Sequence, residues 1–294
     1  MSRRSRSNPR PDLDFTPVRN GMDYLVSAVK HLTEGSTPPD ARDLKYAVLH
    51  LQAATEVLLK ARLVREHWSL VFKDPGGATR EKFEKGAFES CGLSATMDRL
   101  VKIAGVPISD KAREAIGDLA DTRNALTHYG HTANAYAVEA RAARVLAFLL
   151  DFIHQQLHPA LSSEAHWVMN TMDVLRLKLS GIESLVKERM KELSGELAPL
   201  AERTVICPVC RQWALVVGED SPTCRFCLNE WLDPLDAVAD YGWMVLGEDN
   251  FAVGECPICG REGAVVVGGS VAETKSEDVG LCFQCGQIYR KKDQ

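Results

Sequence analysis

The sequence predicts a mainly α-helical protein with a small β-rich C-terminal part, and three observations lead to this fold class. Up to about residue 160, apolar residues recur at helical spacing between Gly- and Pro-containing breaks. The segment from about 163 to 197 carries a heptad-like apolar repeat. After Thr204, short β-prone runs alternate with C-x-x-C pairs. We therefore expect a disordered basic tail (1–17), a helical bundle (18–160), a linker helix (161–203) and two small cysteine-rich units (204–294).

The composition is that of an ordinary globular chain, and no apolar run approaches the roughly 18 residues of a membrane span. Four arginines lie in the first ten residues, but no apolar stretch of a signal peptide follows them, so we expect a cytoplasmic protein. Residues 1–160 carry 22 Lys and Arg against 19 Asp and Glu, whereas residues 204–294 carry 7 against 14. Phosphate contacts are therefore expected in the N-terminal half, and a regulatory protein partner at the acidic end.

The helices of the bundle follow in order from breaks and caps. We expect helices at about 20–32, 41–68, 94–104 and 134–157, and one after Ser109, which can cap it. Residues 73–82 read as a loop. In the second helix an apolar row is expected to face the core and a polar row to lie on the other side: Leu44, Val48, Leu51, Leu58 and Leu63 against Gln52, Glu56 and Lys60. The last helix is expected to turn Val138, Ala142, Val145, Leu146, Leu149, Phe152 and Ile153 inward.

The linker segment reads as one helix over about 163–197, ended by Pro199. Its apolar residues step by four and three positions, from Val168 to Val186. Such a seam suits a coiled coil with a second chain, and it suits packing on the bundle equally well. Both uses stay open at this point.

Eight of the nine cysteines form four C-x-x-C pairs, which in a chain without a secretory signal favour metal over disulfides. Two such pairs complete a tetrahedral sulfur shell, so two structural zinc ions are expected, with iron as a rival metal. Sequential pairing is favoured over a cross-brace, and the eight predicted ligands are Cys207, Cys210, Cys224 and Cys227, then Cys256, Cys259, Cys282 and Cys285. Cys91 is expected to be a buried, inert thiol. The region resembles tandem zinc ribbons, and the runs "WALVVG", "WMVLG" and "AVVVGG" are their β-prone segments.

The stretch "DTRNALTHYGH" places Arg123, Asn124 and His128 near the end of a predicted helix. An arginine and a histidine there can simply cap carbonyls and complement the helix dipole. They can also handle a phosphate and a proton, because guanidinium grips phosphate and imidazole exchanges a proton near neutral pH. The residues alone leave both readings open.

The Arg-x4-His spacing resembles the signature of the HEPN superfamily, and the long helix "LKYAVLHLQAATEVLLKARL" resembles the second helix of that family. The resemblance covers roughly residues 18–158. It implies a metal-independent endoribonuclease, often a toxin or defence effector, that cleaves RNA through attack by the ribose 2′-OH. It also implies a homodimer, with Arg123, Asn124 and His128 as catalytic residues. A non-catalytic HEPN-like interaction module with a zinc-ribbon adaptor is the alternative.

The chain departs from that family's pattern near the motif. Family toxins paired with nucleotidyltransferase antitoxins carry a tyrosine two residues after the histidine, where this chain has Gly130. Tyr129 lies next to the histidine instead, so regulation through that tyrosine does not carry over. His131 is expected to begin the next helix, and Glu56 to pair with Lys60 one turn away rather than with Arg123.

Overall fold

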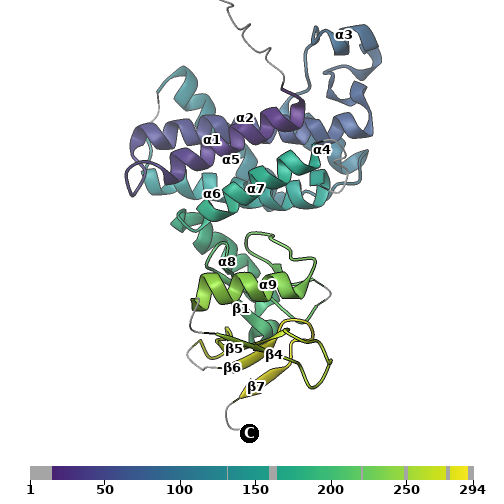
Figure 1. The fold of residues 1–294 in the computed structure, drawn as a ribbon. Coiled ribbons are helices and arrows are strands. Elements are labelled where there is room, and N and C mark those ends of the chain that lie inside the picture. Colours follow the sequence, from purple (N-terminus) through teal and green to yellow (C-terminus); the bar gives the residue numbers. More distant parts are fainter. Residues whose placement is uncertain are drawn as a thin grey trace, which may run out of the picture.

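A computed structural model describes residues 15–130, 132–158, 164–219, 221–247, 251–275 and 279–290. As predicted, the chain is mainly helical, with small antiparallel sheets confined to the C-terminal part (Figure 1). The helices form a body, and the sheets lie beyond α8 at its lower side in the same view. Most of the predicted N-terminal tail, residues 1–14, lies outside the described residues. No helix among the described residues is long and apolar enough to cross a membrane.

The first two helices, α1 (Pro17–Thr33) and α2 (Ala41–Glu66), form an antiparallel hairpin. Asp40 begins α2 because its carboxylate accepts the backbone N–H groups of Arg42 and Asp43. The five predicted core residues of α2, from Leu44 to Leu63, are all buried. Gln52, in the polar row on the other side, is also buried, with only 7% of the residue exposed. The reason is that α2 is central and packs against α1, α4, α5 and α6, so its second side is covered too.

A small lobe follows α2 and contains the 3-10 turns Trp68–Val71 and Pro75–Gly77 and the short helix α3 (Arg80–Glu84). The expected loop over 73–82 is therefore shorter than predicted. The next helix, α4 (Leu93–Lys102), confirms the predicted helix at 94–104 within two residues. Cys91 is buried as predicted, with its Sγ 3.2 Å from Oγ1 of Thr96.

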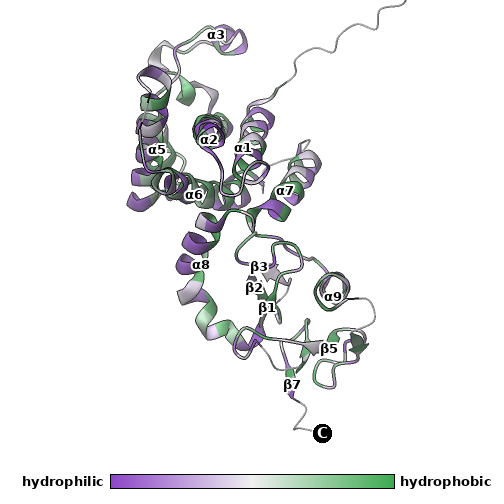
Figure 2. Cartoon of the chain, turned by 90° about the vertical axis from the view of Figure 1, so that its left-hand side faces the viewer, coloured by the Kyte–Doolittle hydropathy of each residue, from purple (hydrophilic) through white to green (hydrophobic). Residues whose placement is uncertain are grey.

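The helices α5 (Asp110–His128) and α6 (Ala135–Phe152) complete the body. Ser109 caps α5 by accepting the backbone N–H of Ala112 at 3.2 Å, as its position predicted. A π-helical turn, Ile153–Leu157, extends α6. Every residue that the sequence placed inward on this last helix is buried. Seen from the side, α2 lies between α1 on one side and α5 and α6 on the other (Figure 2).

The predicted linker helix is two helices, α7 (Ala165–Leu179) and α8 (Glu183–Leu197), so the expectation of one continuous helix was wrong. The chain breaks at Ser180–Ile182, where Ile182 has an extended ψ of 91°. The break lets α7 pack on α1 and α8 on α6, and it buries Val168, Met172, Leu175, Leu179 and Ile182 within one chain. Of the two uses left open for the seam, the structure has packing on the bundle. Pro199 follows as part of a 3-10 turn, Ala198–Arg203.

The C-terminal part has two antiparallel sheets. The first has the order β1 (Thr204–Ile206), β2 (Trp213–Val216) and β3 (Thr223–Cys224). The second has β4 (Ala252–Gly254), β5 (Val265–Gly269), β6 (Val279–Cys282) and β7 (Ile288–Arg290). The predicted β-prone run "WMVLG" instead forms a π-helical turn, Gly242–Leu246. This turn directly continues α9 (Pro234–Tyr241), which Asp233 caps, so these residues extend the helix and do not form a strand.

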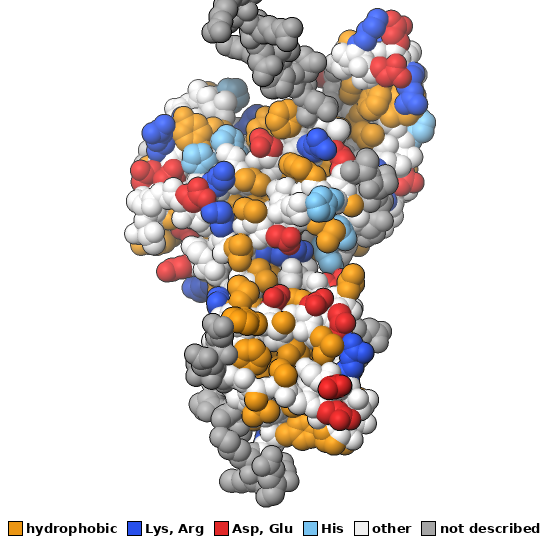
Figure 3. Space-filling view, in the orientation of Figure 1, with side chains coloured by type: hydrophobic (Ala, Val, Ile, Leu, Met, Phe, Trp, Pro, Cys, Tyr) orange, Lys and Arg blue, Asp and Glu red, His pale blue; other side chains and the backbone are white. Residues whose placement is uncertain are grey.

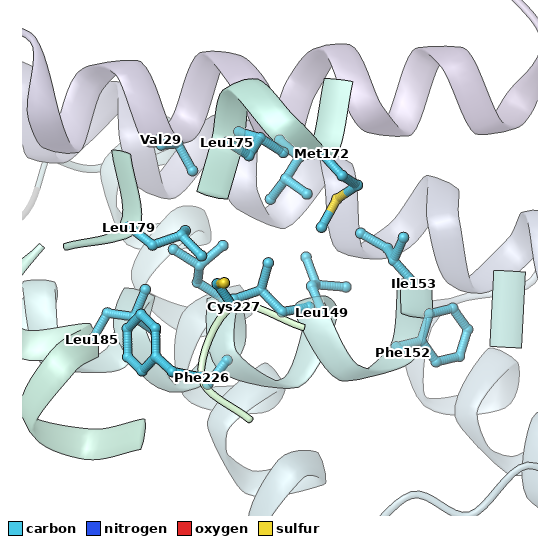
Figure 4. Packing of buried hydrophobic residues seen from close by; sticks show 14 of the residues in the cluster. Val29, Leu149, Phe152, Ile153, Met172, Leu175, Leu179, Leu185, Phe226 and Cys227 are labelled. Carbon is cyan, nitrogen blue, oxygen red and sulfur yellow. The ribbon is translucent and has the colours of Figure 1, made fainter. Parts of the chain in front are cut away.

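One hydrophobic core joins the helical body to the first sheet (Figure 4), and it also includes Val266, Val279 and Leu281 of the second sheet. Phe226 and Cys227, from the first cysteine unit, point toward Leu149 of α6 and Leu185 of α8. The second cysteine unit has a small core of its own around Cys256 and Cys282. The first cysteine unit is therefore part of the helical body's core, whereas the outer half of the second is not.

Candidate metal centres and the Arg–Asn–His site

The eight cysteines of the C-x-x-C pairs come together as two groups of four, and within each group the sulfur atoms lie within 4.8 Å of one another. In the first group, Sγ of Cys207 is 3.9 Å from that of Cys227, and Sγ of Cys210 is 3.6 Å from that of Cys224. A tetrahedral ion with sulfur ligands at about 2.3 Å requires sulfur–sulfur distances of about 3.8 Å. Each group therefore has the dimensions of a four-sulfur metal site, far from the short S–S bond of a disulfide.

The second group has the same dimensions and the same sequential pairing. The corresponding distances are 3.7 Å between Cys256 and Cys285 and 3.8 Å between Cys259 and Cys282. The sequentially paired arrangement is thus the one that the structure contains, and the cross-brace is not.

The four C-x-x-C turns share one backbone geometry. In each, the residue after the second cysteine has a positive φ, and its N–H donates to the carbonyl of the first cysteine at 2.7 to 2.9 Å. Gly260 and Gly286 adopt this conformation without steric cost. In the first unit Arg211 and Leu228 adopt it, at φ values of 61° and 59°. A side chain in this region carries a cost of about 1 kcal/mol, which indicates that the turn is imposed by the sulfur cluster.

The electrostatics of the first group suit a bound cation. Burial holds the pKa of the Cys224 thiol well above its usual range, and the neighbouring thiols raise it further. Four buried thiolates so close together would repel one another, and a bound divalent cation removes that repulsion. The residues therefore fit a metal ion that acts as a cross-link.

The two groups differ in exposure. All four cysteines of the first group are buried, whereas Cys259 and Cys285 of the second are exposed. The second group also has a polar neighbour, because the hydroxyl of Tyr289 lies 3.1 Å from Sγ of Cys256. The second site is thus the one that solvent and chelators reach first.

Two arginines join the first four-sulfur group to the helices, and the sequence did not predict this role for either. Arg189 of α8 is 3% exposed and makes two hydrogen bonds to the Asp151 carboxylate of α6, at 2.7 and 2.9 Å. It also donates to the backbone carbonyls of Phe226 at 2.6 Å and Arg225 at 3.2 Å. Arg176 of α7 donates to the carbonyls of Cys227 and Leu228 in the same turn. A buried arginine within a heptad-like helix gives no sequence signal of its partner, because the partner is set by tertiary packing.

The three predicted catalytic residues lie together at the C-terminal end of α5. Arg123 is half-buried, and Asn124 and His128 are exposed. One guanidinium nitrogen of Arg123 donates to Oδ1 of Asn124 at 2.9 Å. Helix geometry places His128 about 40° from Asn124 around the helix and about 140° from Arg123. Asn124 therefore stands between the other two, and the helix alone does not bring Arg123 and His128 of one chain into contact.

The surroundings of this motif are open and aromatic. Tyr129 is 90% exposed and Tyr136, at the start of α6, is 75% exposed. A groove of about 840 Å³ lies beside it, between the α1–α2 connection, α6 and α8, and Tyr136 is one of its lining residues. Arg123, Asn124 and His128 are not among those lining residues. The motif therefore lies on the surface of the single chain, outside this groove.

Other residues singled out near the motif are accounted for in part. Glu56 pairs with Lys60 at 2.5 Å, one turn along α2, as expected, and Lys60 also reaches Ser90. Gly130 has a φ of 73° after the end of α5, which explains a glycine at that position. His131 lies outside the described residues.

Comparison with known proteins gives no relative for this chain: no family model, no curated protein and no solved structure matches it.

Proposed function

We propose that the protein is a metal-independent endoribonuclease of the HEPN type, with Arg123, Asn124 and His128 as its active residues. The observation that carries the proposal is the hydrogen-bonded Arg123–Asn124 pair beside an exposed His128 at one helix end. These groups supply a phosphate-binding guanidinium and a proton acceptor, and they need no metal to do so.

The chemistry follows from the three groups. His128 takes the proton of a ribose 2′-OH, and the 2′ oxygen attacks the adjacent phosphorus. Arg123 holds the phosphate oxygens as charge builds on them, and Asn124 fixes the guanidinium. The bond from phosphorus to the 5′ oxygen breaks, and that oxygen needs a proton. The products are a 2′,3′-cyclic phosphate and a 5′-hydroxyl end.

A second chain is the best source of that last proton. The motif is open to solvent, and a two-fold dimer would place both copies of His128 around one scissile phosphate. Tyr129 and Tyr136 give this surface the exposed aromatic area that dimer interfaces use. In this proposal the active unit is a homodimer formed through the ends of α5.

The two four-sulfur groups are proposed to hold structural zinc. With four sulfur ligands, zinc has no open position for water, so it would cross-link the chain rather than catalyse. The first ion would hold together the two C-x-x-C turns of the first unit, whose second turn Arg176 and Arg189 join to α7 and α8, and the second ion would hold together those of the second unit. The net negative charge of residues 204–294 suits a regulatory protein partner better than RNA.

A non-catalytic interaction module is the second candidate. The observation in its favour is that Arg123 and His128 do not line the groove beside α6, while Phe226 and Cys227 of the first cysteine unit join the helical core. Such a fused core would serve well as a rigid adaptor.

RNA cleavage separates the two candidates. The purified full chain is incubated with a labelled single-stranded RNA in EDTA, and its zinc content is measured after the reaction. We expect cleavage with 2′,3′-cyclic phosphate ends, and none from Arg123→Ala or His128→Ala. His166→Ala, an exposed helix histidine elsewhere, is the matched control and should cleave normally. Wild-type protein that retains zinc and leaves RNA intact would refute the nuclease and favour the adaptor.

A further inference from the structure

A second cluster of ring side chains lies across the hairpin of α1 and α2, apart from the Arg–Asn–His site. It consists of Tyr24 and His31 on α1 and Tyr46 and His50 on α2, and we refer to these four residues as the Tyr–His patch. The rings of His31 and Tyr46 are stacked, with centroids 5.4 Å apart. Tyr24 lies 6.0 Å from His50, and the two imidazoles lie 5.5 Å apart.

Helical spacing brings these rings to one face. Tyr24 and His31 are seven residues apart, and an antiparallel partner helix repeats the step with Asp43 and His50. All four rings of the patch are half-buried, so each keeps part of its surface in solvent. In Figure 3, histidine side chains lie among hydrophobic, basic and acidic side chains over this hairpin.

Both imidazoles are held in place from one side. Nδ1 of His50 is 2.9 Å from the hydroxyl of Ser27, and Nδ1 of His31 is 3.1 Å from the Asp43 carboxylate. No described residue contacts Nε2 of either ring through a hydrogen bond. The rings are therefore fixed in orientation while one polar edge remains available to a ligand.

Two basic side chains border the patch. The guanidinium of Arg42 lies 5.8 Å from the Tyr46 ring centroid, and Nζ of Lys45 lies 5.7 Å from it. Neither forms an ion pair with a described carboxylate, because Asp43 faces His31 and Asp40 caps α2. Their positive charges are thus free to neutralise another group.

We propose that the Tyr–His patch binds single-stranded nucleic acid, with a base stacked on Tyr46 and His31 and the neighbouring phosphates on Arg42 and Lys45. Stacked aromatic rings beside unpaired basic groups are the combination by which proteins bind single strands without reading sequence. Asp23, exposed near His50, disfavours a phosphate at that end, so the strand passes over the Arg42 end. The inference rests on the proposed function for its biological ligand, RNA, and it adds a substrate-holding surface distinct from the cleavage site.

The test uses a fluorescein-labelled single-stranded DNA 12-mer, which has no 2′-OH and is not cleaved. Binding to the full chain is followed by anisotropy at several salt concentrations. We expect Tyr46→Ala to weaken binding about tenfold or more, the range for loss of one stacked base. Tyr46→Phe keeps the ring and should bind as wild type. Arg42→Ala together with Lys45→Ala should also reduce the slope of log K against log salt by about 1.4, from two lost phosphate contacts.

The control is Arg80→Ala, which removes a cation stacked over Trp68 at 5.4 Å in the α3 lobe and should leave binding unchanged. Circular dichroism of each variant ensures that the folded chain is compared. Wild-type protein that binds no single strand, or a Tyr46→Ala variant that binds normally, overturns the proposal. Because the probe is DNA, a failure of RNA cleavage would leave this result standing. Normal DNA binding by Tyr46→Ala would in turn leave the nuclease intact.

Discussion

Arg189 offers the sharpest test of how the first metal unit is joined to the helices. Replacing it with Met keeps an unbranched apolar stem but removes the guanidinium that donates to Asp151 and to three backbone carbonyls, those of Phe226, Arg225 and Ala147. The carbonyls of Phe226 and Arg225 would each lose their hydrogen bond from the guanidinium, at about 1–3 kcal/mol for each unsatisfied buried group. The Asp151 side chain is 44% exposed, so water compensates it in part.

We therefore expect Arg189→Met to lower the free energy of unfolding by about 3 kcal/mol. For a chain of this size, that corresponds to a decrease in melting temperature of about 6–12 °C. Thermal unfolding followed by circular dichroism measures it, and a chelator competition measures faster zinc loss from the first site. Arg113→Met, which breaks the partly exposed pair with Asp98, is the control and should cost at most about 1 kcal/mol. Equal melting temperatures of Arg189→Met and wild type would show that the guanidinium does not stabilise the contact between the first cysteine unit and the helices.

Three further predictions follow from the packing and charges. Cys224→Ser and Cys259→Ser should each lower the zinc content by one ion per chain, as measured by metal analysis. Only Cys224→Ser should lower the helical circular dichroism signal at 222 nm, because Cys224 belongs to the helical core, and equal effects on the helices would contradict this. Gly218→Ala should destabilise the chain, since the added Cβ would lie 2.5 Å from the backbone of Gly286 at a φ of 78°, whereas Gly195→Ala in α8 meets open space and should stabilise it by up to about 1 kcal/mol in urea unfolding. Burial, followed by the charge of His158, lowers the pKa of His154 below 6.5, so the stability that this residue contributes should be lost as the pH falls from 6.5 through the lowered value. In urea unfolding from pH 7 to 5, His154→Gln should therefore lose less free energy of unfolding than wild type, and identical pH profiles would exclude this role.

The features that the sequence predicted correctly depend on short-range chemistry. The spacing of the cysteine pairs was enough to assign two four-sulfur groups, because a hairpin of that length brings two C-x-x-C turns face to face. Ser109 as a cap and the buried row from Val138 to Ile153 followed from helical periodicity.

The features that the sequence did not predict depend on long-range packing. The seam from Val168 to Ile182 keeps its 4–3 steps through the break between α7 and α8, so periodicity could not reveal two helices. Gln52 is buried because a further helix covers that side of α2, which no local pattern encodes. The residues of "WMVLG" have strand propensity, but the preceding helix α9 continues into them as a π-helical turn.

The candidate catalytic site shows the same division. Arg123, Asn124 and His128 could be selected by type and spacing, and the Arg123–Asn124 hydrogen bond is a local contact. The spacing did not indicate that the motif would lie on the surface, outside the groove that Tyr136 lines. The Tyr–His patch had a signal in helical spacing, with a step of seven residues on α1 and of four on α2, but it needed the hairpin register to bring His31 next to Tyr46.

In the proposed dimer two chains share one ribonuclease site, and mixing two inactive variants tests this sharing. Arg123→Ala and His128→Ala chains are each assayed alone on single-stranded RNA, then mixed and allowed to exchange subunits. A heterodimer carries one intact His128, from the first variant, and one intact Arg123, from the second. We therefore expect cleavage to return in part in the mixture, with 2′,3′-cyclic phosphate ends. A mixture that forms heterodimers, as shown by differently tagged chains, and still cleaves no RNA would contradict the shared site.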